Sequence, residues 1–265
     1  MASITKLTAQ KKPGRFNVFV DGKYAFAVSE STLIHFRLTK GMSLDDDLQA
    51  QIQAQEVIAQ ANTLALSYLS RQQRTEHELR VKLTEAELPA AAIDAAIAHM
   101  HALHYLDDAQ YAQAFINDNL HLSDKGPAVV LAKLQQRGVA EALIHQALAA
   151  VADEAWLTPA RKAAKKAAAQ SSRQPFYRRQ QKIRQAVIQK GFTPDLADSV
   201  LAELELEADP DDEADQLHQA AKKLWRQKRQ YPDYERRQRV KQALFRKGFA
   251  LDAIDTVLDQ LSQEA

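Results

Sequence analysis

The pattern of apolar and polar positions at the start of the chain predicts β-strands. Large residues alternate with others over 15–20 (RFNVFV) and again over 23–28 (KYAFAV), as in strands that bury one face. The Asp21-Gly22 pair between these runs is a strong signal for a two-residue hairpin turn. With the short mixed segment 4–7, the runs predict a small three-stranded antiparallel sheet.

Helices are expected to follow this sheet. A short helix is predicted over 31–36, and Gly41 fits a turn. Acidic residues at 45–47 favour the start of a long helix that reaches Ser70, because negative side chains interact favourably with the positive end of the helix dipole.

The rest of the chain repeats one apolar spacing four times. Each copy has three anchors separated by four and then five residues, followed by apolar residues five and nine positions after the last anchor. The last anchors are Leu88, Val139, Phe192 and Phe249, which lie 51, 53 and 57 residues apart. A glycine precedes this anchor in three copies, at Gly138, Gly191 and Gly248, whereas the first copy has Glu87. The glycine is expected to end a helix in the left-handed conformation, so each unit is predicted to hold three helices and to stack on its neighbours.

These patterns predict a mainly α fold of about four tandem three-helix repeats behind a small N-terminal antiparallel β-sheet domain. The predicted segments are a sheet-plus-helix extension over 1–60 and repeats over 61–106, 107–153, 154–207 and 208–265. Residues 153–159 and 208–212 are expected to be linkers between repeats. The second is expected to be flexible, because Pro210 lies within a run of carboxylates.

Composition and charge narrow the functional class. The chain has no cysteine, which excludes disulfides and thiolate metal sites, and no apolar run long enough to cross a bilayer. We therefore expect a cytoplasmic protein without a membrane partner. The net charge is only +1, but residues 161–194 carry ten Lys and Arg with no acid, and residues 222–247 carry eleven against two acids. Such segregation indicates a polyanionic partner, such as nucleic acid.

The candidate contact residues are mainly basic residues beside the core anchors. A shift of 57 residues superposes Arg179 on Arg236 and Lys182 on Arg239, so equivalent helices are expected to present charge in one direction. Stacked repeats would turn this into a stripe that follows a phosphate backbone; the alternative is a set of solvated helix faces. The predicted contact residues are Arg74, Arg80, Lys82, Lys125, Lys133, Arg137, Arg178, Arg179, Lys182, Arg184, Lys190, Arg236, Arg237, Arg239, Lys241 and Lys247.

No catalytic, cofactor-binding or small-molecule site is predicted, because the sequence has neither a glycine-rich phosphate loop nor a Gly-x-Ser-x-Gly motif. The strongest metal candidate is the set His99, His101 and His104. A histidine-rich helix end is the favoured interpretation, because further ligands of the usual types are not evident nearby, and no metal is predicted.

Aromatic residues lie near the basic helices. Phe176, Tyr177, Tyr231 and Tyr234 have the chemistry to stack on bases, but core or helix-closing roles are favoured for them. Trp225 is expected in the core. Three short helices with a glycine turn also resemble a helix-turn-helix reader, but charge dispersed over four related units favours groove-following over sequence reading.

Several motifs resemble those of one family. Residues 74–83 (RTEHELRVKL), 105–108 (YLDD) with the aromatic residues at 111 and 115, and 125–127 (KGP) are similar to helix-start segments of RecX regulatory proteins. The resemblance covers about residues 60–260, and the N-terminal hairpin resembles the extension of longer Gram-positive members. Physically these segments mark helix starts. Thr75 and Glu78 predict a capping box, Asp107 and Asp108 predict caps for the next helix, and Pro127 suits a first helical turn.

The resemblance implies a function that the spacing of residues does not. RecX-like proteins are expected to bind RecA and its filament on single-stranded DNA and to inhibit or modulate RecA ATPase and strand exchange, with roles in DNA repair, recombination and the SOS response. Weak nonspecific DNA binding would accompany this role. Two alternatives stay open: an autonomous, sequence-nonspecific nucleic-acid binder that uses the basic stripe, and an enzyme with a histidine metal site.

Overall fold

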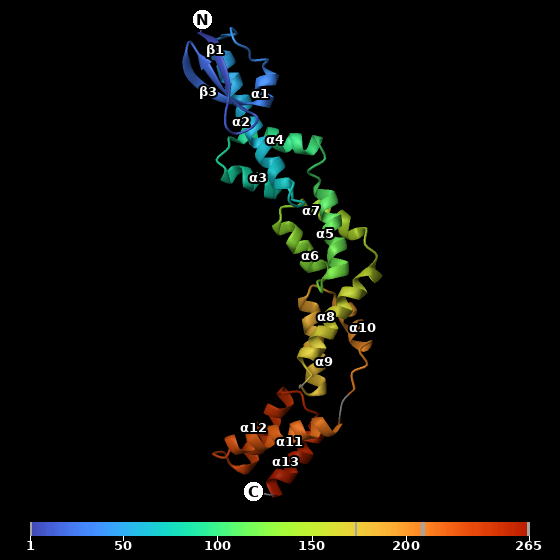
Figure 1. Cartoon of the computed structure of the whole chain (residues 1–265). Coiled ribbons are helices and arrows are strands. Elements are labelled where there is room, and N and C mark those ends of the chain that lie inside the picture. The colour runs from blue at the N-terminus through green and yellow to red at the C-terminus, as the bar shows by residue number, and fades with distance from the viewer. Residues whose placement is uncertain (1, 173, 208–209, 264–265) are drawn as a thin grey trace. The chain divides into compact units, whose positions relative to one another are not determined.

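A computed structural model describes residues 2–172, 174–207 and 210–263 (Figure 1). The chain divides into two compact units, one of Met1–Ala114 with Lys133–Ala147 and one of Phe115–Ala132 with Leu148–Ala265. Both units draw on helices of the predicted second repeat, so the predicted domain boundaries stay a prediction. Among the described residues, no helix combines the length and the apolar character needed to traverse a lipid bilayer.

The N-terminal sheet has four strands in the order β3-β2-β1-β4, all antiparallel (Figure 1). The strands are β1 (Ala2–Ala9), β2 (Arg15–Val20), β3 (Lys23–Ser29) and β4 (Ser43–Leu44). The hairpin turn is confirmed, since Asp21 and Gly22 have φ values of 48° and 79°. The prediction of three strands was wrong, because β4 pairs with the first residues of β1. Two residues are too short a run to show alternation.

One buried carboxylate fixes the sheet to the long helix α2 (Asp46–Leu69). Glu56 is 5% exposed and accepts hydrogen bonds from the Ser29 backbone N (2.6 Å), the Thr32 hydroxyl (2.9 Å) and the Arg15 guanidinium (3.0 Å). Ser29 caps α1 (Glu30–His35), so this carboxylate joins β2, β3, α1 and α2. Burial alone would raise the pKa of Glu56, but the hydrogen bonds outweigh it and hold the pKa below its ordinary value.

The remaining elements are helices, and they confirm the mainly α prediction. They are α3 (Glu76–Glu85), α4 (Ala90–Ala102), α5 (Asp108–Leu122), α6 (Pro127–Gln136), α7 (Glu141–Ala149), the 3-10 turn η1 (Asp153–Trp156), α8 (Leu157–Gln170), α9 (Phe176–Gln189), α10 (Pro194–Ala202), α11 (Pro210–Gln227), α12 (Asp233–Arg246) and α13 (Leu251–Gln263). The predicted anchors are buried in all four copies, except that Leu88 is half-buried. The apolar spacing therefore located the core.

The two predicted linkers are largely helical. Residues 153–159 form η1 and the start of α8, and Trp156 and Pro159 are buried there. Pro210 is the first residue of α11, so the linker prediction was wrong from that residue on; proline suits a first helical turn because it needs no backbone donor there. Ala208 and Asp209 lie outside the described residues.

The predicted capping box is present, with Thr75 and Glu78 each bonded to the other's backbone N. Asp107 accepts a hydrogen bond from the Gln110 backbone N at the start of α5, as predicted. Asp108 does not cap that helix: its carboxylate accepts from the Glu76 backbone N, at the start of α3. Burial raises the pKa of Asp108 above its ordinary value, against the effect of this hydrogen bond.

The glycine turns explain how neighbouring repeats pack. Gly138, Gly191 and Gly248 have φ values of 78°, 92° and 93°, as predicted. Each also lies against the first turn of the second helix in the preceding repeat: a Cβ on Gly138 would overlap His77, one on Gly191 would lie 2.7 Å from the Val129 backbone N, and one on Gly248 would lie 2.7 Å from Arg178 Cβ. Glycine is therefore needed for the backbone conformation and for the close approach.

In the first repeat, Glu87 stands at the position of the turn glycine. It adopts the same left-handed conformation, with φ 57°, but it is exposed. The first repeat has no three-helix repeat before it, so no helix needs to approach at this position. The departure that the sequence shows at Glu87 thus has a geometric reason.

Hydrogen bonds accompany two of these contacts. The Thr75 hydroxyl donates to the Arg137 carbonyl at 2.6 Å. The Gly126 and Ala128 backbone N–H groups donate to the carbonyls of Lys190 (2.7 Å) and Gly191 (3.2 Å). In both cases a helix start supplies donors to the carbonyls at a helix end, groups that a helix leaves without internal partners.

We predict that Gly191→Ala destabilises the protein more than Gly41→Ala. Both glycines have nearly the same φ, 92° and 91°, but a Cβ at Gly41 meets nothing within 4 Å. Gly41→Ala should lower the free energy of unfolding by about 1–2 kcal/mol through backbone strain alone, and Gly191→Ala by a further 1 kcal/mol or more, roughly, through overlap with Val129. Urea unfolding of both variants measures the difference, and equal losses would contradict the close-approach argument.

We predict that Glu56→Gln lowers stability by about 1–3 kcal/mol at neutral pH, because it weakens a buried, charge-assisted hydrogen-bond set. The folded-state pKa lies below the unfolded one, so the ionised carboxylate contributes stability above the unfolded value of about 4.3. That contribution is lost as the pH falls through the folded value. Unfolding measured from pH 7 down to pH 3 should therefore show a shallower acid dependence in Glu56→Gln than in the unmodified chain; identical slopes would refute this role.

Candidate nucleic-acid interface

One basic position recurs in three repeats as half of an ion pair. The residue directly after the first anchor reaches a carboxylate fourteen positions later, on the third helix of the same repeat. The pairs are Arg80–Asp94 at 2.6 Å, Arg184–Asp198 at 2.5 Å and Lys241–Asp255 at 2.6 Å. The second repeat has Leu131 and His145 at these positions. The recurrence of this charge therefore has a structural explanation that involves no DNA.

These pairs also shift the pKa values of their members. The hydrogen bond from Arg184 lowers the pKa of Asp198, and the same bond raises the pKa of Arg184. The hydrogen bond to Asp94 is the main cause that raises the pKa of Arg80, and Glu76 adds to it. A phosphate would compete with a carboxylate for either arginine, so the recurrence of this charge alone does not indicate DNA contact.

Further predicted contact residues have carboxylate partners close by in sequence or space. Arg74 lies 3.6 Å from Glu78, and Lys82 lies 3.1 Å from Glu85. Arg239 bonds Glu235 at 2.7 Å, and Arg237 bonds Asp259 at 2.6 Å. All four basic residues lie on second helices or directly before one. Three of the pairs join residues within four positions of each other, whereas Arg237 reaches Asp259 on α13.

Arg236 and Arg137 hold helices together through aromatic residues. Arg236 donates twice to the Trp225 carbonyl, at 3.0 and 2.7 Å, and its guanidinium lies 4.1 Å from the centre of the Trp225 ring. This contact joins α12 to α11 and confirms Trp225 as a core residue, 6% exposed. Arg137 donates to the Tyr111 hydroxyl and lies 5.7 Å from that ring.

Asp124 gathers three lysines before α6. Lys190 bonds it at 2.8 Å, and Lys125 and Lys166 lie at 3.6 and 3.7 Å. Burial alone would raise the pKa of Asp124, but the hydrogen bond from Lys190 and the three positive charges hold it below its ordinary value. Two predicted contact residues, Lys125 and Lys190, are thereby placed at the turn where the second and third repeats meet.

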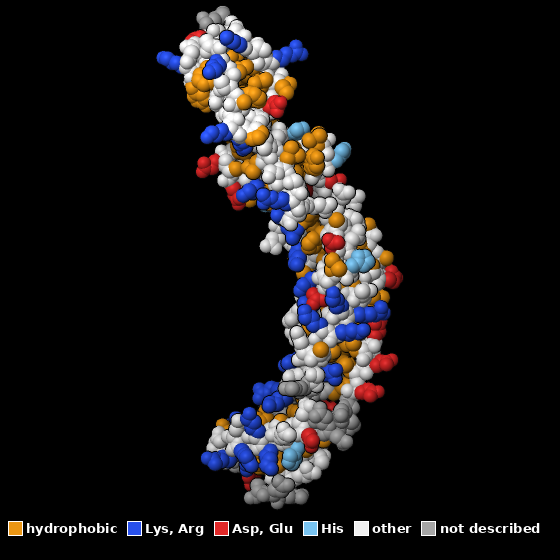
Figure 2. All heavy atoms as spheres, viewed as in Figure 1, with side chains coloured by type: hydrophobic (Ala, Val, Ile, Leu, Met, Phe, Trp, Pro, Cys, Tyr) orange, Lys and Arg blue, Asp and Glu red, His pale blue; other side chains and the backbone are white. Residues whose placement is uncertain are grey.

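Five other predicted residues have neither an ion pair nor a side-chain hydrogen bond in the part of the chain that the structure describes: Lys133, Arg178, Arg179, Lys182 and Lys247. Lys133, Arg178, Lys182 and Lys247 are exposed, whereas Arg179 is half-buried and its Nε is buried without a hydrogen-bond partner among the described residues. Figure 2 shows Lys and Arg side chains gathered over α11 and α12. Two residues there, Lys223 and Arg246, were missed, because the prediction considered mainly the neighbours of the anchors on second helices.

Two tyrosines differ from their predicted roles. Tyr177 and Tyr234 are 60% and 79% exposed, so the prediction of core or helix-closing roles was wrong for both. Phe176 and Tyr231 are half-buried, and the Arg239 guanidinium lies 4.1 Å from the Tyr231 ring centre. Exposed aromatic rings beside basic residues are available for stacking.

Two of the three histidines in the metal hypothesis, His99 and His101, have separate hydrogen-bond partners. His99 contacts the Asn62 amide oxygen at 3.1 Å, and His101 lies between Glu76 (3.0 Å) and the Leu106 carbonyl (3.2 Å). Among the residues described, no group of three or more His, Asp or Glu side chains is placed to hold a metal ion. The hydrogen bond with His101 is the main cause that lowers the pKa of Glu76.

Comparison with known proteins gives the family. Models of the RecX N-terminal domain and of the first, second and third RecX three-helix domains match residues 2–45, 61–100, 107–148 and 211–258. The matches leave α8–α10 between the second and third domains.

Full-length relatives and solved structures agree with these matches. Regulatory protein RecX of Levilactobacillus brevis is 44% identical over 265 residues, covering all of both chains, and that of Lacticaseibacillus casei is 42% identical over 99% of this chain and 100% of its own. A crystal structure of regulatory protein RecX is 36% identical and covers 76% of this chain and 98% of that one, with a TM-score of 0.67. RecX from Lactobacillus salivarius is 30% identical and covers 57% and 98%, with a TM-score of 0.53. The chain therefore belongs to the RecX family of regulatory proteins.

Proposed function

We propose that this chain regulates RecA by binding RecA and its filament on single-stranded DNA, and that it lowers RecA ATPase and strand exchange. The observation that carries the proposal is the family likeness, which extends over the whole chain and includes the N-terminal domain and three-helix domains in order. The relatives are named regulatory proteins, and the RecA partnership comes from the resemblance of the helix-start motifs.

The repeat architecture supports a filament partner. A filament presents the same surface at regular intervals, and tandem repeats present related surfaces at regular intervals along a chain. The glycine turns pack consecutive repeats tightly enough to exclude even a methyl group. Such packing fixes the contacting helices of neighbouring repeats against each other.

Binding, without chemistry of its own, is the mode of action that we propose. The motif residues that resemble RecX helix starts serve the fold: Thr75 and Asp108 bond backbone groups, and Pro127 begins α6. His99 and His101 have ordinary hydrogen-bond partners. We also propose that the protein acts in the cytoplasm, where its filament partner would form on DNA.

A second candidate function is autonomous, sequence-nonspecific nucleic-acid binding. It is favoured by the basic residues without carboxylate partners on α9 and α12. Affinity for single-stranded DNA would then be high without RecA and would fall steeply with salt, because each phosphate contact releases counterions. Weak binding with a shallow salt dependence would favour the filament-dependent function.

The direct test is RecA's single-stranded-DNA-dependent ATPase, measured while the amount of this chain increases. We predict progressive inhibition that is still present when the chain is substoichiometric to DNA nucleotides, with heat-denatured chain as the control. A rate that stays constant at every ratio would contradict the proposal. Displacement of RecA by DNA competition alone would require saturation of the DNA, so inhibition well below saturation separates the two candidates.

A further inference from the structure

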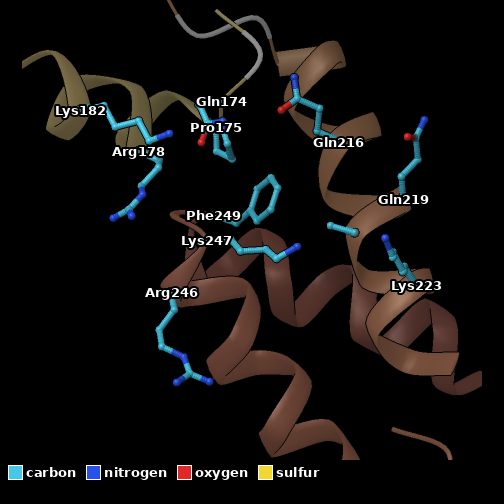
Figure 3. A pocket seen from close by; sticks show the side chains of 11 residues that line it. Gln174, Pro175, Arg178, Lys182, Gln216, Gln219, Lys223, Arg246, Lys247 and Phe249 are labelled. Carbon is cyan, nitrogen blue, oxygen red and sulfur yellow. The ribbon is translucent and has the colours of Figure 1, made fainter. Parts of the chain in front are cut away.

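A cationic cavity lies between the start of α9, α11 and the end of α12. Its volume is about 650 Å³, within the range of ligand sites. The lining includes five basic side chains and no Asp or Glu: Arg178, Lys182, Lys223, Arg246 and Lys247. Figure 3 shows Lys247 extending past the Phe249 ring toward the helix that carries Lys223, with Arg178 and Arg246 on the opposite side.

The cavity cations differ from the ion-paired residues that directly follow first anchors. Arg184 bonds Asp198 and Lys241 bonds Asp255. Among the described residues, none of the five cavity cations has an ion pair. Like charges that converge on one cavity repel one another, so the arrangement is stabilised when an anion occupies it.

The start of α9 borders the same cavity, since Pro175 and Arg178 line it. Pro175 precedes the helix without a side-chain cap, and the first turn contains no acidic residue. Its first amides therefore lack intrahelical acceptors, and a helix start of this kind favours a nearby anion. The equivalent helix α12 also follows a proline but has Asp233 and Glu235 in its first turn. The 57-residue shift places Arg178 where the fourth repeat has Glu235.

Aromatic rings border the cationic cavity. A neighbouring cavity of about 610 Å³ shares Arg178, Arg246 and Phe249 with it and is also lined by Tyr177 and Phe245. Tyr177 and Phe245 are 60% and 56% exposed. The one acidic side chain of this second cavity is Glu213, which does not line the first. Phosphate-binding cations next to exposed rings are the combination by which proteins hold single-stranded nucleic acid.

We propose that the cavity binds a backbone phosphate of single-stranded nucleic acid and that the adjoining ring of Tyr177 or Phe245 stacks on a base of the same strand. The phosphate accepts hydrogen bonds from Lys182, Lys223 and Lys247. The site needs no RecA, so its failure would leave the proposed regulation of RecA untouched.

The test measures binding of the full-length chain to a fluorescent oligo-dT by anisotropy, without RecA. The double variant Lys223→Gln/Lys247→Gln should lose about tenfold or more in affinity, and the log–log salt slope should fall by about 1.4, the value for two lost contacts to a single strand. The matched control Lys222→Gln/Arg229→Gln removes the same charge from the same repeat outside the cavity lining. Its affinity should change less than about threefold.

Two further arms separate the parts of the proposal. Tyr177→Ala should weaken oligo-dT binding and leave binding of an abasic oligonucleotide unchanged, because only the former offers bases to stack. Pyrophosphate should compete with oligo-dT for the unmodified chain and much less for the double variant. Equal losses in the double variant and its control, with thermal unfolding unchanged in both, would overturn the site. An unchanged oligo-dT affinity in both Tyr177→Ala and Phe245→Ala would overturn the stacking role.

Discussion

The helical part of this protein depends on one contact, made three times: a glycine turn that closes a repeat lies against the first helical turn of the repeat before it. Gly138, Gly191 and Gly248 all combine a positive φ with a neighbour too close for a side chain. The contact brings together a helix end, whose last carbonyls lack internal partners, and a helix start, whose first N–H groups lack internal partners. For example, the backbone N–H groups of Gly126 and Ala128 donate directly to the carbonyls of Lys190 and Gly191. Repeats that bury little alone are thereby held in order.

The sequence predicted this scaffold well because its determinants are local or periodic. The anchors Ile183 and Val187 lie one helical turn apart, and Gly191 after them indicates the helix end. What the glycine packs against was not predictable, because His77 and Arg178 look like ordinary exposed residues of a first turn. Asp108 was assigned to its own helix for the same reason: its true partner, the Glu76 backbone N, is 32 residues away.

The candidate interface was harder to predict than the fold. Arg184 and Lys182 are equally basic and two residues apart, yet one bonds Asp198 while the other lines a cavity without acids. The number of charges in the sequence cannot distinguish these two residues, because the difference depends on which residue of the third helix carries a carboxylate. Lys223 was missed because the prediction considered mainly second helices. This residue lies on a first helix, and only the packing of the third and fourth repeats brings it to the cavity. Family likeness supplied the regulatory role, which no residue pattern in the chain specifies.

The stacked glycine contact thus links the fold to its proposed functions, because Arg178, which Gly248 approaches, and Lys247 and Phe249, which flank that glycine, line the cationic cavity. Amide hydrogen exchange by NMR tests it most directly. Gly126 and Ala128 lie at the start of α6, where helix amides have no internal acceptor and ordinarily exchange fast. The account predicts strong protection of both, because the carbonyls of Lys190 and Gly191 accept from them, and fast exchange of Tyr177 at the uncapped start of α9. Fast exchange of Gly126 and Ala128 would contradict the account.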